Sequence, residues 1–353
     1  MIIFAFIFGA LLFIPWKVES KGFNESYLSR DTANAIKGAF CFFMLAAHFT
    51  QNDFYPIWKT DYWFLSFKKF YDQLVVSVLF FYSAYGIMES IRAKGLGYVK
   101  RIPVSRFLKT YIPYVIALLI FIAANTLFGI RYSRADIVLS LTAWRTIGID
   151  NWYIFTIFVF YFMTWAVFLL CRKNHFLANC LLTAGTVLFI AALKYAGRDS
   201  YWYDILMVYP MGFWYSHYRE KIERWLFCNR HYYPVFAAVL SLLFIIWVGI
   251  CRMNGEYSVI LYELCACLWM AGVLLFTMKV RPENRILKFI GKNLTGYYML
   301  HRLALLITPT TKFFIILTPV RFLLFFAIST VFAVVFTYIS GKITGAVIRK
   351  IHA

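Results

Sequence analysis

The sequence predicts an all-α fold, a polytopic bundle of about ten or eleven transmembrane helices, and three observations lead to this class. Hydrophobic residues make up 62% of the 353 residues and charged residues only 15%, whereas a soluble domain carries about 25% charged residues. The apolar residues gather in runs that match the roughly 20 residues a helix needs to cross the hydrocarbon core. The connectors are short, so no segment could form a soluble domain that buries this apolar surface.

The apolar runs define the expected helices in order along the chain. We place these helices at residues 2–16, 34–51, 73–91, 110–130, 152–171, 177–194, 202–217, 233–251, 258–278, 294–309 and 320–347. The first run lacks the basic flank and the small-residue cleavage site of a signal peptide, so we interpret it as a retained helix. Residues 1–31 are then an N-terminal hydrophobic segment with a cytoplasmic linker. Residues 32–353 are one membrane domain of ten core helices.

The net charge of +20 is explained by the arrangement of the loops. Loops that alternate to one side of the predicted membrane hold 24 of the 36 Lys and Arg residues. By the positive-inside rule this side is cytoplasmic, which also places the C-terminus inside. The basic excess is therefore a topology signal, and no nucleic-acid partner is expected. The compact inner stretch 92–109 carries six of these basic residues and no acid.

The remaining loops and the cysteines add few chemical groups. Two outer stretches, 52–72 and 131–151, mix aromatic and charged residues, and the second includes Asp150. Such composition is typical of segments that lie at the outer interface. Most of the seven cysteines fall within apolar runs, where cysteine behaves as a small apolar residue. No two histidines are spaced i, i+4, so no metal site is expected.

Polar residues inside a membrane helix are costly, and the first core helix has two of them. Lys37 and His48 are eleven residues apart. Eleven steps of about 100° bring both side chains to one helix face, about 16 Å apart along the axis. This face offers a cation near the cytoplasmic end and an imidazole further out. The alternative is structural, with Lys37 as an anchor whose amine reaches the interface and His48 as a packed, hydrogen-bonded histidine.

Two further groups of polar residues follow. His301 lies near mid-membrane in the helix 294–309 and is followed directly by Arg302. The structural alternative is that these two residues form a buried polar pair that orients the helix bundle. Arg106 and Lys109 have the i, i+3 spacing that places side chains on one helix face. With Arg101 close by, these cations suit a phosphate-bearing ligand, although topology alone could also explain them.

These groups, in this order, resemble the acyltransferase 3 family, which includes bacterial membrane enzymes that O-acetylate surface polysaccharides. The family has a basic residue, ten residues and then a histidine, as in residues 37–48. It has two basic residues at i, i+3 ahead of Tyr-x-Pro, as in residues 106–113 with Lys109 in place of the second Arg. It also has Phe-Phe-x-Ser-Gly, which residues 80–84 match with Ser83 present and Ala84 in place of Gly.

Three weaker matches extend the resemblance over residues 30–305. Residues 151–161, which begin Asn151-Trp152, are similar to the family's Trp-Phe-Leu and Phe-Tyr segment, but the acidic residue often seen there is absent and Ile157 is the nearest position. Residues 209–212 resemble the Phe-Pro-x-Gly motif. Residues 291–301 resemble the closing segment, in which Gly-Lys precedes Tyr-Leu-Leu-His.

The resemblance implies an O-acyltransferase that takes an acyl group, expected to be acetyl, from acyl-coenzyme A on the cytoplasmic side. The acceptor would be a hydroxyl of an extracytoplasmic or lipid-linked glycan at a bacterial cell membrane. Separate glycan-synthesis proteins are possible partners, because larger members carry an additional soluble domain that does not follow residue 353 here. No metal is implied.

The resemblance also assigns roles to individual residues. The cations expected to hold the coenzyme A phosphates are Lys37, Arg106, Lys109 and Arg101. The step of about 16 Å to His48 is comparable to an extended pantetheine arm. His48 would be the general base or would carry the acyl group briefly, and His301 would share the catalytic centre, orienting the acceptor or stabilising the oxyanion. The expected substrate contacts are Tyr298, Asn151, Trp152 and Ser83.

Two other function classes stay open at this stage. A transporter or flippase for a lipid-linked saccharide would use the same buried charges as a translocation path. Such proteins often contain inverted repeats and helices broken near mid-membrane, and we find neither in the sequence. A glycan polymerase would have a long outer loop with several Arg residues, for which residues 131–151 are short.

Overall fold

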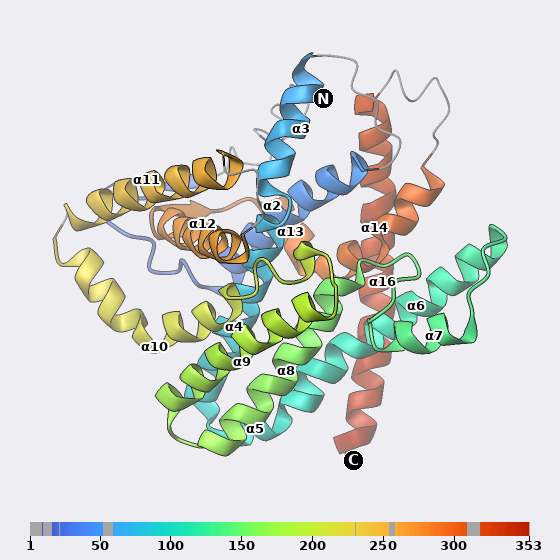
Figure 1. The fold of residues 1–353 in the computed structure, drawn as a ribbon, viewed down its shortest axis with the longest axis horizontal. Helices are drawn as coiled ribbons and strands as arrows, with labels where there is room; N and C mark the ends of the chain where they lie inside the picture. Colours follow the sequence, from blue (N-terminus) through green and yellow to red (C-terminus); the bar gives the residue numbers. More distant parts are fainter. Residues whose placement is uncertain are drawn as a thin grey trace.

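The computed structural model describes residues 16–20, 22–51, 59–229, 231–253, 258–308 and 318–352, together with Gly9. Within these residues the chain is almost entirely helical (Figure 1), and the strands β1 and β2 form one short ribbon. The all-α prediction is therefore confirmed. The predicted helix over residues 2–16 lies outside the described residues, except for Gly9 and Trp16.

The helices follow one another with short connections. Those of the first half are α2 (Arg30–Phe49), α3 (Lys59–Tyr71), α4 (Leu74–Lys94), α5 (Leu96–Ile102), the π-helix η1 (Pro103–Leu108), α6 (Lys109–Leu127), α7 (Arg134–Leu141) and α8 (Asn151–Cys171). Those of the second half are α9 (His175–Tyr195), the 3₁₀ helix η2 (Ser200–Trp202), α10 (Val208–Phe227), α11 (Tyr232–Met253), α12 (Val259–Lys279), α13 (Arg285–Lys292), α14 (Leu294–Ile307) and α16 (Thr318–His352).

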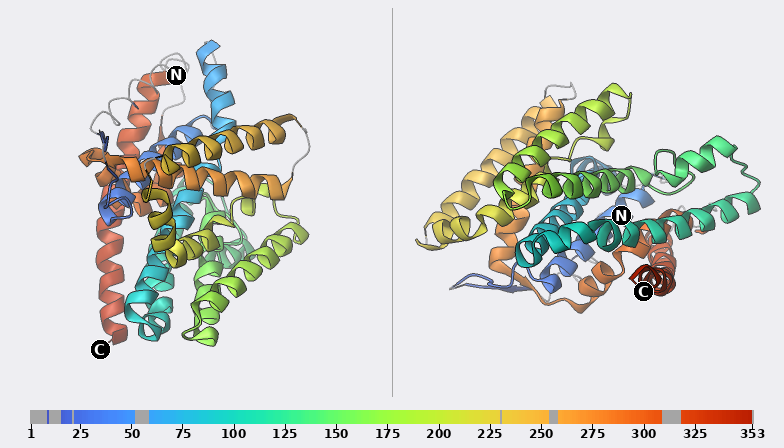
Figure 2. Two further views of the ribbon diagram at one scale, coloured as in Figure 1. Left: turned by 90° about the vertical axis from the view of Figure 1, so that its left-hand side faces the viewer. Right: turned by 90° about the horizontal axis from the view of Figure 1, so that it is seen from below.

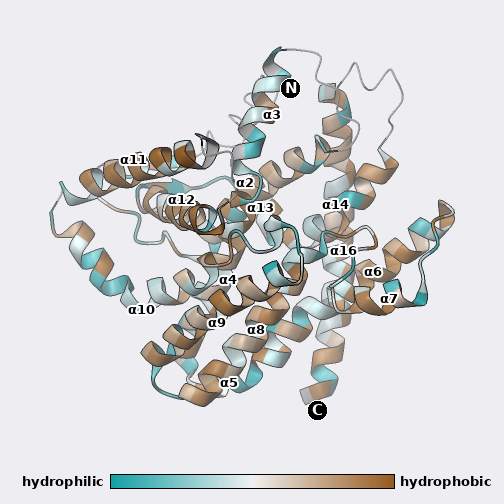
Figure 3. Ribbon diagram, viewed as in Figure 1, coloured by the Kyte–Doolittle hydropathy of each residue, from teal (hydrophilic) through white to brown (hydrophobic). Residues whose placement is uncertain are grey.

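Seven of the described helical segments are long and apolar enough to cross a membrane. They are α4, the continuous segment Leu96–Leu127, α8, α9, α11, α12 and α16. Figure 3 shows apolar residues over most of their length, and only 6% of the apolar window of α11 is buried inside the protein. Apolar surface on this scale needs lipid or another apolar partner around it.

The predicted spans in α2, α10 and α14 are not among these seven helices. The 14-residue α14 is shorter than a bilayer-crossing helix, while α2 carries Arg30, Asp31 and Lys37. The number of ten core spans therefore stays a prediction. Figure 2 shows the long α16 at one side of the bundle, and α11 and α12 lying side by side at another.

Two predicted boundaries differ from the structure. The predicted helix over 202–217 begins instead at Val208 and continues to Phe227. The buried Glu263 side chain on α12 causes this start, because its carboxylate accepts hydrogen bonds from the backbone N–H groups of Leu206 and Met207 at 2.8 and 2.9 Å. These donors would otherwise be unsatisfied at the helix N-terminus. The stretch 92–109, predicted as a compact loop, is helical through α5 and η1.

Close contact between α2 and α13 positions the two histidine-bearing helices. A Cβ atom on Gly38 would collide with the backbone carbonyl of Leu287, and one on Gly291 would collide with that of Asn34. Only glycine permits this approach of two backbones. Because α14 follows α13 directly, the same contact fixes α14 against α2.

A third glycine explains a departure from the family motif. A Cβ on Gly212 of α10 would lie 2.8 Å from the Ala84 Cβ and 2.8 Å from the Phe81 carbonyl oxygen. The missing side chain on α10 therefore leaves room for the alanine that stands at residue 84 of α4.

The short ribbon joins two segments that are far apart in the sequence. It pairs β1 (Trp16–Val18) with β2 (Val280–Pro282) in antiparallel register, with Lys17 opposite Arg281.

Candidate active site

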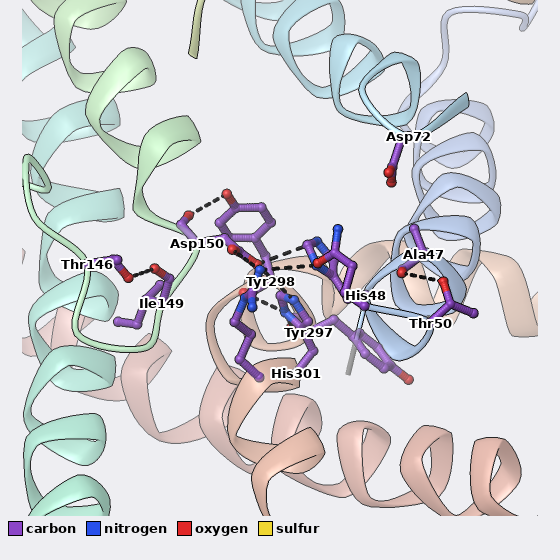
Figure 4. A network of polar contacts seen from close by, with 12 residues as sticks. Ala47, His48, Thr50, Asp72, Thr146, Ile149, Asp150, Tyr297, Tyr298 and His301 are labelled. Carbon is purple, nitrogen blue, oxygen red and sulfur yellow. Dashed lines mark hydrogen bonds and ion pairs between the residues drawn. The ribbon is translucent and has the colours of Figure 1, made fainter. Parts of the chain in front are cut away.

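A carboxylate that the sequence did not single out lies at the centre of the candidate site. Asp150 precedes the first residue of α8, and its Oδ1 accepts a charge-assisted hydrogen bond from Arg302 Nη2 at 2.7 Å. Its Oδ2 lies 3.1 Å from Nε2 of His301 and 3.5 Å from Nε2 of His48. Figure 4 shows both imidazoles beside Asp150, with His48 from α2 and His301 from α14.

The turn before α8 directs this carboxylate into the protein. Asp150 occupies the N-cap position, but its side chain makes no capping hydrogen bond. The turn is held by Asn151, whose side-chain amide donates to the Ala143 carbonyl at 2.7 Å. At Gly148, φ is 120° and the Phe121 ring packs where a Cβ would be, so only glycine fits.

The two histidines are close but differ in their surroundings. Their ring centroids are 4.6 Å apart. His301 is 1% exposed, and its Nδ1 lies 3.0 Å from the backbone carbonyls of Tyr297 and Tyr298. His48 is partly exposed, and its Nδ1 lies 2.9 Å from the side-chain oxygen of Gln51 and 3.4 Å from Arg302 Nη2. The structure thus brings together the two histidines that the sequence predicts to be catalytic.

A cavity of about 470 Å³, which we call the outer cavity, opens on this cluster. Its lining is mostly polar and includes the predicted contacts Asn151 and Trp152; it consists of His48, Gln51, Gln73, Thr146, Gly148, Ile149, Asp150, Asn151, Trp152, Tyr201 and Arg302. A smaller adjoining space of about 60 Å³ is shared by His48, Trp152 and Tyr298. Amide and hydroxyl groups beside an indole suit a polar, ring-shaped ligand.

A second cavity of about 230 Å³, which we call the inner cavity, contains two of the four cations predicted to bind the donor phosphates. Lys37 and Arg106 line it together with Ser83, and Tyr298 forms part of its wall. No acidic residue is among the described residues that line it. Arg106 donates to the Tyr98 hydroxyl at 2.8 Å, and the Ser83 and Tyr161 hydroxyls are 3.1 Å apart. Two cations without a carboxylate between them favour an anionic ligand.

Lys109 and Arg101 lie elsewhere. Both side chains are exposed, and neither lines the inner cavity. The expected shared face of Arg106 and Lys109 assumed α-helical spacing, but residues 103–108 form a π-helix. The wider π turn changes the angle between residues three apart. Pro103 stands at the start of this turn and lacks the N–H that an α-helix would use there.

Tyr298 lines both the inner cavity and the small space beside His48. That small space shares several lining residues with the outer cavity. The Tyr298 hydroxyl donates to the Asp150 carbonyl oxygen at 2.6 Å, so it also supports the turn that carries the carboxylate. Tyr298 is therefore the residue through which the space of Lys37 and Arg106 and the space of His48 meet.

The sequence signals for Asp150 and Arg302 were present but indirect. Asp150 comes immediately before the matched Asn151-Trp152 pair, whereas the motif comparison points to Ile157 as the nearest position for the acid, and Ile157 lines the inner cavity. Arg302 is marked in the sequence only as the neighbour of His301. Asp150 and Arg302 would predict this cluster only with the knowledge that the turn before α8 directs the Asp150 side chain into the protein.

The largest of the cavities that we describe is unrelated to this chemistry. It measures about 740 Å³ and is lined by apolar side chains of α2, α11 and α12. Ser241 is its single hydroxyl-bearing residue among the described lining. With almost no polar group to orient a reactant, it is a poor candidate for a catalytic site.

Comparison with known proteins gives one result. Residues 31–338 match the family model described as "Acyltransferase domain". No curated protein and no solved structure matches the chain. The matched region includes the α2 histidine motif, the inner cation pair, the carboxylate before α8 and the closing histidine motif on α14. The chain therefore belongs to this acyltransferase family, acyltransferase 3, as the ordered motifs of its sequence predicted.

Proposed function

We propose that the protein is a multi-pass O-acyltransferase of a bacterial cell membrane that transfers an acyl group, expected to be acetyl, from cytoplasmic acyl-coenzyme A to a glycan hydroxyl. The acceptor is extracytoplasmic or linked to a lipid. The observation that carries the proposal is that Tyr298 lines both the inner cavity, which contains Lys37 and Arg106, and the small space beside His48.

The inner cavity suits the donor. Lys37 and Arg106 would bind phosphate or pyrophosphate oxygens. Arg106 belongs to the basic stretch 92–109, which the positive-inside rule makes cytoplasmic. Arg101 and Lys109, which are exposed, would contact only parts of the nucleotide that stay outside the cavity. The pantetheine arm would then pass Tyr298 and bring the thioester to His48.

The outer cavity suits the acceptor. Gln51, Gln73 and Asn151 offer amide groups, and Trp152 with Tyr201 offers apolar faces. This combination matches a sugar, whose ring has apolar faces and a rim of hydroxyl groups. An acceptor hydroxyl in this cavity would meet the thioester at His48.

The chemistry then follows from the groups present. A nitrogen of neutral His48 takes the proton of the acceptor hydroxyl while the oxygen attacks the thioester carbonyl carbon. The tetrahedral intermediate carries an oxyanion, for which Arg302 is the nearest cation at the cluster. The carbon–sulfur bond breaks, and the leaving thiolate of coenzyme A takes the proton from His48. The products are the O-acyl ester and free coenzyme A.

The test uses membranes that contain the full chain and radiolabelled acetyl-CoA. Label should enter surface glycan with the unmodified protein and be lost with His48→Ala. The matched control is His217→Ala, because His217 packs on Trp214 and Tyr218 of α10. Equal labelling by His48→Ala and the unmodified protein would rule out the assignment. Absence of label with every acyl donor, together with movement of a lipid-linked sugar, would favour the transporter class instead.

A further inference from the structure

The surroundings of His301 determine where its first proton lies. Its Nδ1 lies 3.0 Å from two backbone carbonyl oxygens, those of Tyr297 and Tyr298. Carbonyl oxygens accept hydrogen bonds and never donate them. Nδ1 therefore carries a hydrogen, and the neutral form of the ring has its lone pair on Nε2.

That lone pair faces a second acceptor. His301 Nε2 lies 3.1 Å from Asp150 Oδ2, and neither atom makes another conventional hydrogen bond among the described residues. A bare nitrogen and an ionised carboxylate at this distance, both buried, would repel each other. A hydrogen between them turns the same geometry into a charge-assisted hydrogen bond.

We propose that His301 and Asp150 hold one proton between them throughout the reaction, so that His48 alone exchanges a proton with the substrates. The proposal rests on the proposed acyl transfer and deepens it. With this proton the pair is electrically neutral, and Arg302, bonded to Asp150 Oδ1 at 2.7 Å, leaves the cluster with one net positive charge.

The second histidine is built for the opposite role. Its Nδ1 faces the side-chain amide of Gln51 at 2.9 Å, which can turn to present either its oxygen or its NH₂ group. Arg302 Nη2 at 3.4 Å favours the tautomer of His48 with a bare Nδ1, but no backbone carbonyl excludes the other tautomer as two carbonyls do at His301. The net positive charge beside it disfavours a second resting charge on its ring and favours the oxyanion that forms during attack.

Other ionisable groups face the cluster, and among the described residues none of them makes a hydrogen bond to Asp150 Oδ2 or His301 Nε2. Asp72 contributes to the small space beside His48, and Tyr201 lines the outer cavity. Tyr298 directs its hydroxyl to the Asp150 backbone carbonyl rather than to the carboxylate. The hydrogen between His301 and Asp150 is thus a property of the pair.

A divalent metal is the competing occupant. The facing atoms of His48, Asp150 and His301 lie within 4.8 Å of one another, a set that could hold such an ion. The guanidinium of Arg302 already neutralises Asp150 from the other oxygen, which disfavours a further dication. A bound metal would displace the shared proton and keep both imidazoles neutral.

The first experiment reads the protons without requiring activity. The full chain, labelled with ¹⁵N-histidine, is placed in lipid nanodiscs, and nitrogen NMR spectra are recorded between pH 6 and 8.5, with His301→Gln assigning the signals. We expect both His301 nitrogens to be protonated or to share a proton, while His48 shows a bare nitrogen. A bare His301 Nε2 overturns the proposal, as does one equivalent of metal whose removal by EDTA shifts both histidines. Because no transfer is measured, failure of the acyltransferase assignment would be seen separately.

The second experiment ranks two isosteric variants by kcat. Asp150→Asn keeps the pair neutral, because the amide donates to the bare Nε2, and its loss should stay below about tenfold. His301→Gln removes the shared proton, so the cluster loses its net positive charge beside the oxyanion, and kcat should fall about 100-fold with the donor KM nearly unchanged. If the pair held no proton, His301→Gln would keep its charge and Asp150→Asn would change it. The opposite ranking therefore overturns the proposal, and a purely structural role would lower the folded yield of both.

Discussion

The inner and outer cavities differ in whether the cations that line them have an acidic partner. In the inner cavity Lys37 and Arg106 have no acidic partner among the described lining. In the outer cluster Arg302 is bound to Asp150, which also faces two imidazoles. Cations without a counterion attract an anionic ligand, whereas a cation bonded to a carboxylate that also faces two imidazoles holds these side chains in a fixed geometry. We therefore expect the inner cavity to bind the donor and the outer cluster to perform the chemistry.

The largest effect should come from a substitution that removes both regions at once. Gly291→Val would place a side chain against the Asn34 backbone and force α2 and α13 apart. We expect a loss of more than about 4 kcal/mol in the free energy of unfolding and little folded protein. Fluorescence-detected size-exclusion chromatography would measure the yield. Gly345→Val is the matched control, since nothing lies within 4 Å of a Cβ at Gly345; equal yields of the two variants would contradict the packing argument.

Arg302→Gln should break the outer cluster while sparing the inner cavity. It removes the cation 2.7 Å from Asp150 and the one nearest to His48. We expect kcat to fall about 100-fold and the donor KM to stay within about threefold. Arg302→Lys, which keeps the charge but loses the forked geometry, should recover part of kcat. A rise in donor KM without a change in kcat would show instead that Arg302 helps to bind the donor.

Arg106→Gln should have the reverse signature. Removal of one of two cavity cations is expected to raise the donor KM about tenfold and to leave kcat within about threefold. The matched control is Lys109→Gln, three residues further along and exposed to the outside of the cavity, for which the KM change should be below about twofold. Steady-state kinetics with varied acetyl-CoA decide the matter, and equal effects of the two variants would show that the π-helix does not separate their roles.

Tyr298→Phe should give the smallest effect, because it removes one hydrogen bond at the boundary of the two regions. The lost donor to the Asp150 carbonyl is worth about 1 kcal/mol of folding stability. We expect a small decrease in Tm and a decrease in kcat of several-fold. Unchanged values of both would indicate that the turn before α8 is held by Asn151 without help from Tyr298.

The sequence predicted what depends on a single helix. The 3.6-residue repeat places Lys37 and His48 on one side of α2, and in the structure Lys37 lines the inner cavity and His48 the outer cavity. The all-α class followed from composition together with the lengths of the apolar runs and of the connectors. Most helix boundaries agree within a few residues because apolar runs end where polar residues begin.

The sequence could not predict what depends on contacts between distant segments. Asp150 acquires its partners only because a turn shaped by Gly148 and Asn151 faces α14. The start of α10 depends on Glu263, more than fifty residues away. The exposure of Lys109 depends on a π turn, which the local sequence indicates only through Pro103. In each case the deciding partner lies outside the pattern being interpreted.

The most direct test of the separation between donor binding and chemistry is equilibrium binding of radiolabelled acetyl-CoA to His48→Gln in lipid nanodiscs. The account predicts that this variant binds the donor with the affinity of the unmodified protein, within about threefold, and transfers no acyl group. A loss of affinity greater than about tenfold would show that His48 helps to bind the donor. Continued acyl transfer would show that His48 is not a catalytic residue. Either result would contradict the division between the inner and outer cavities.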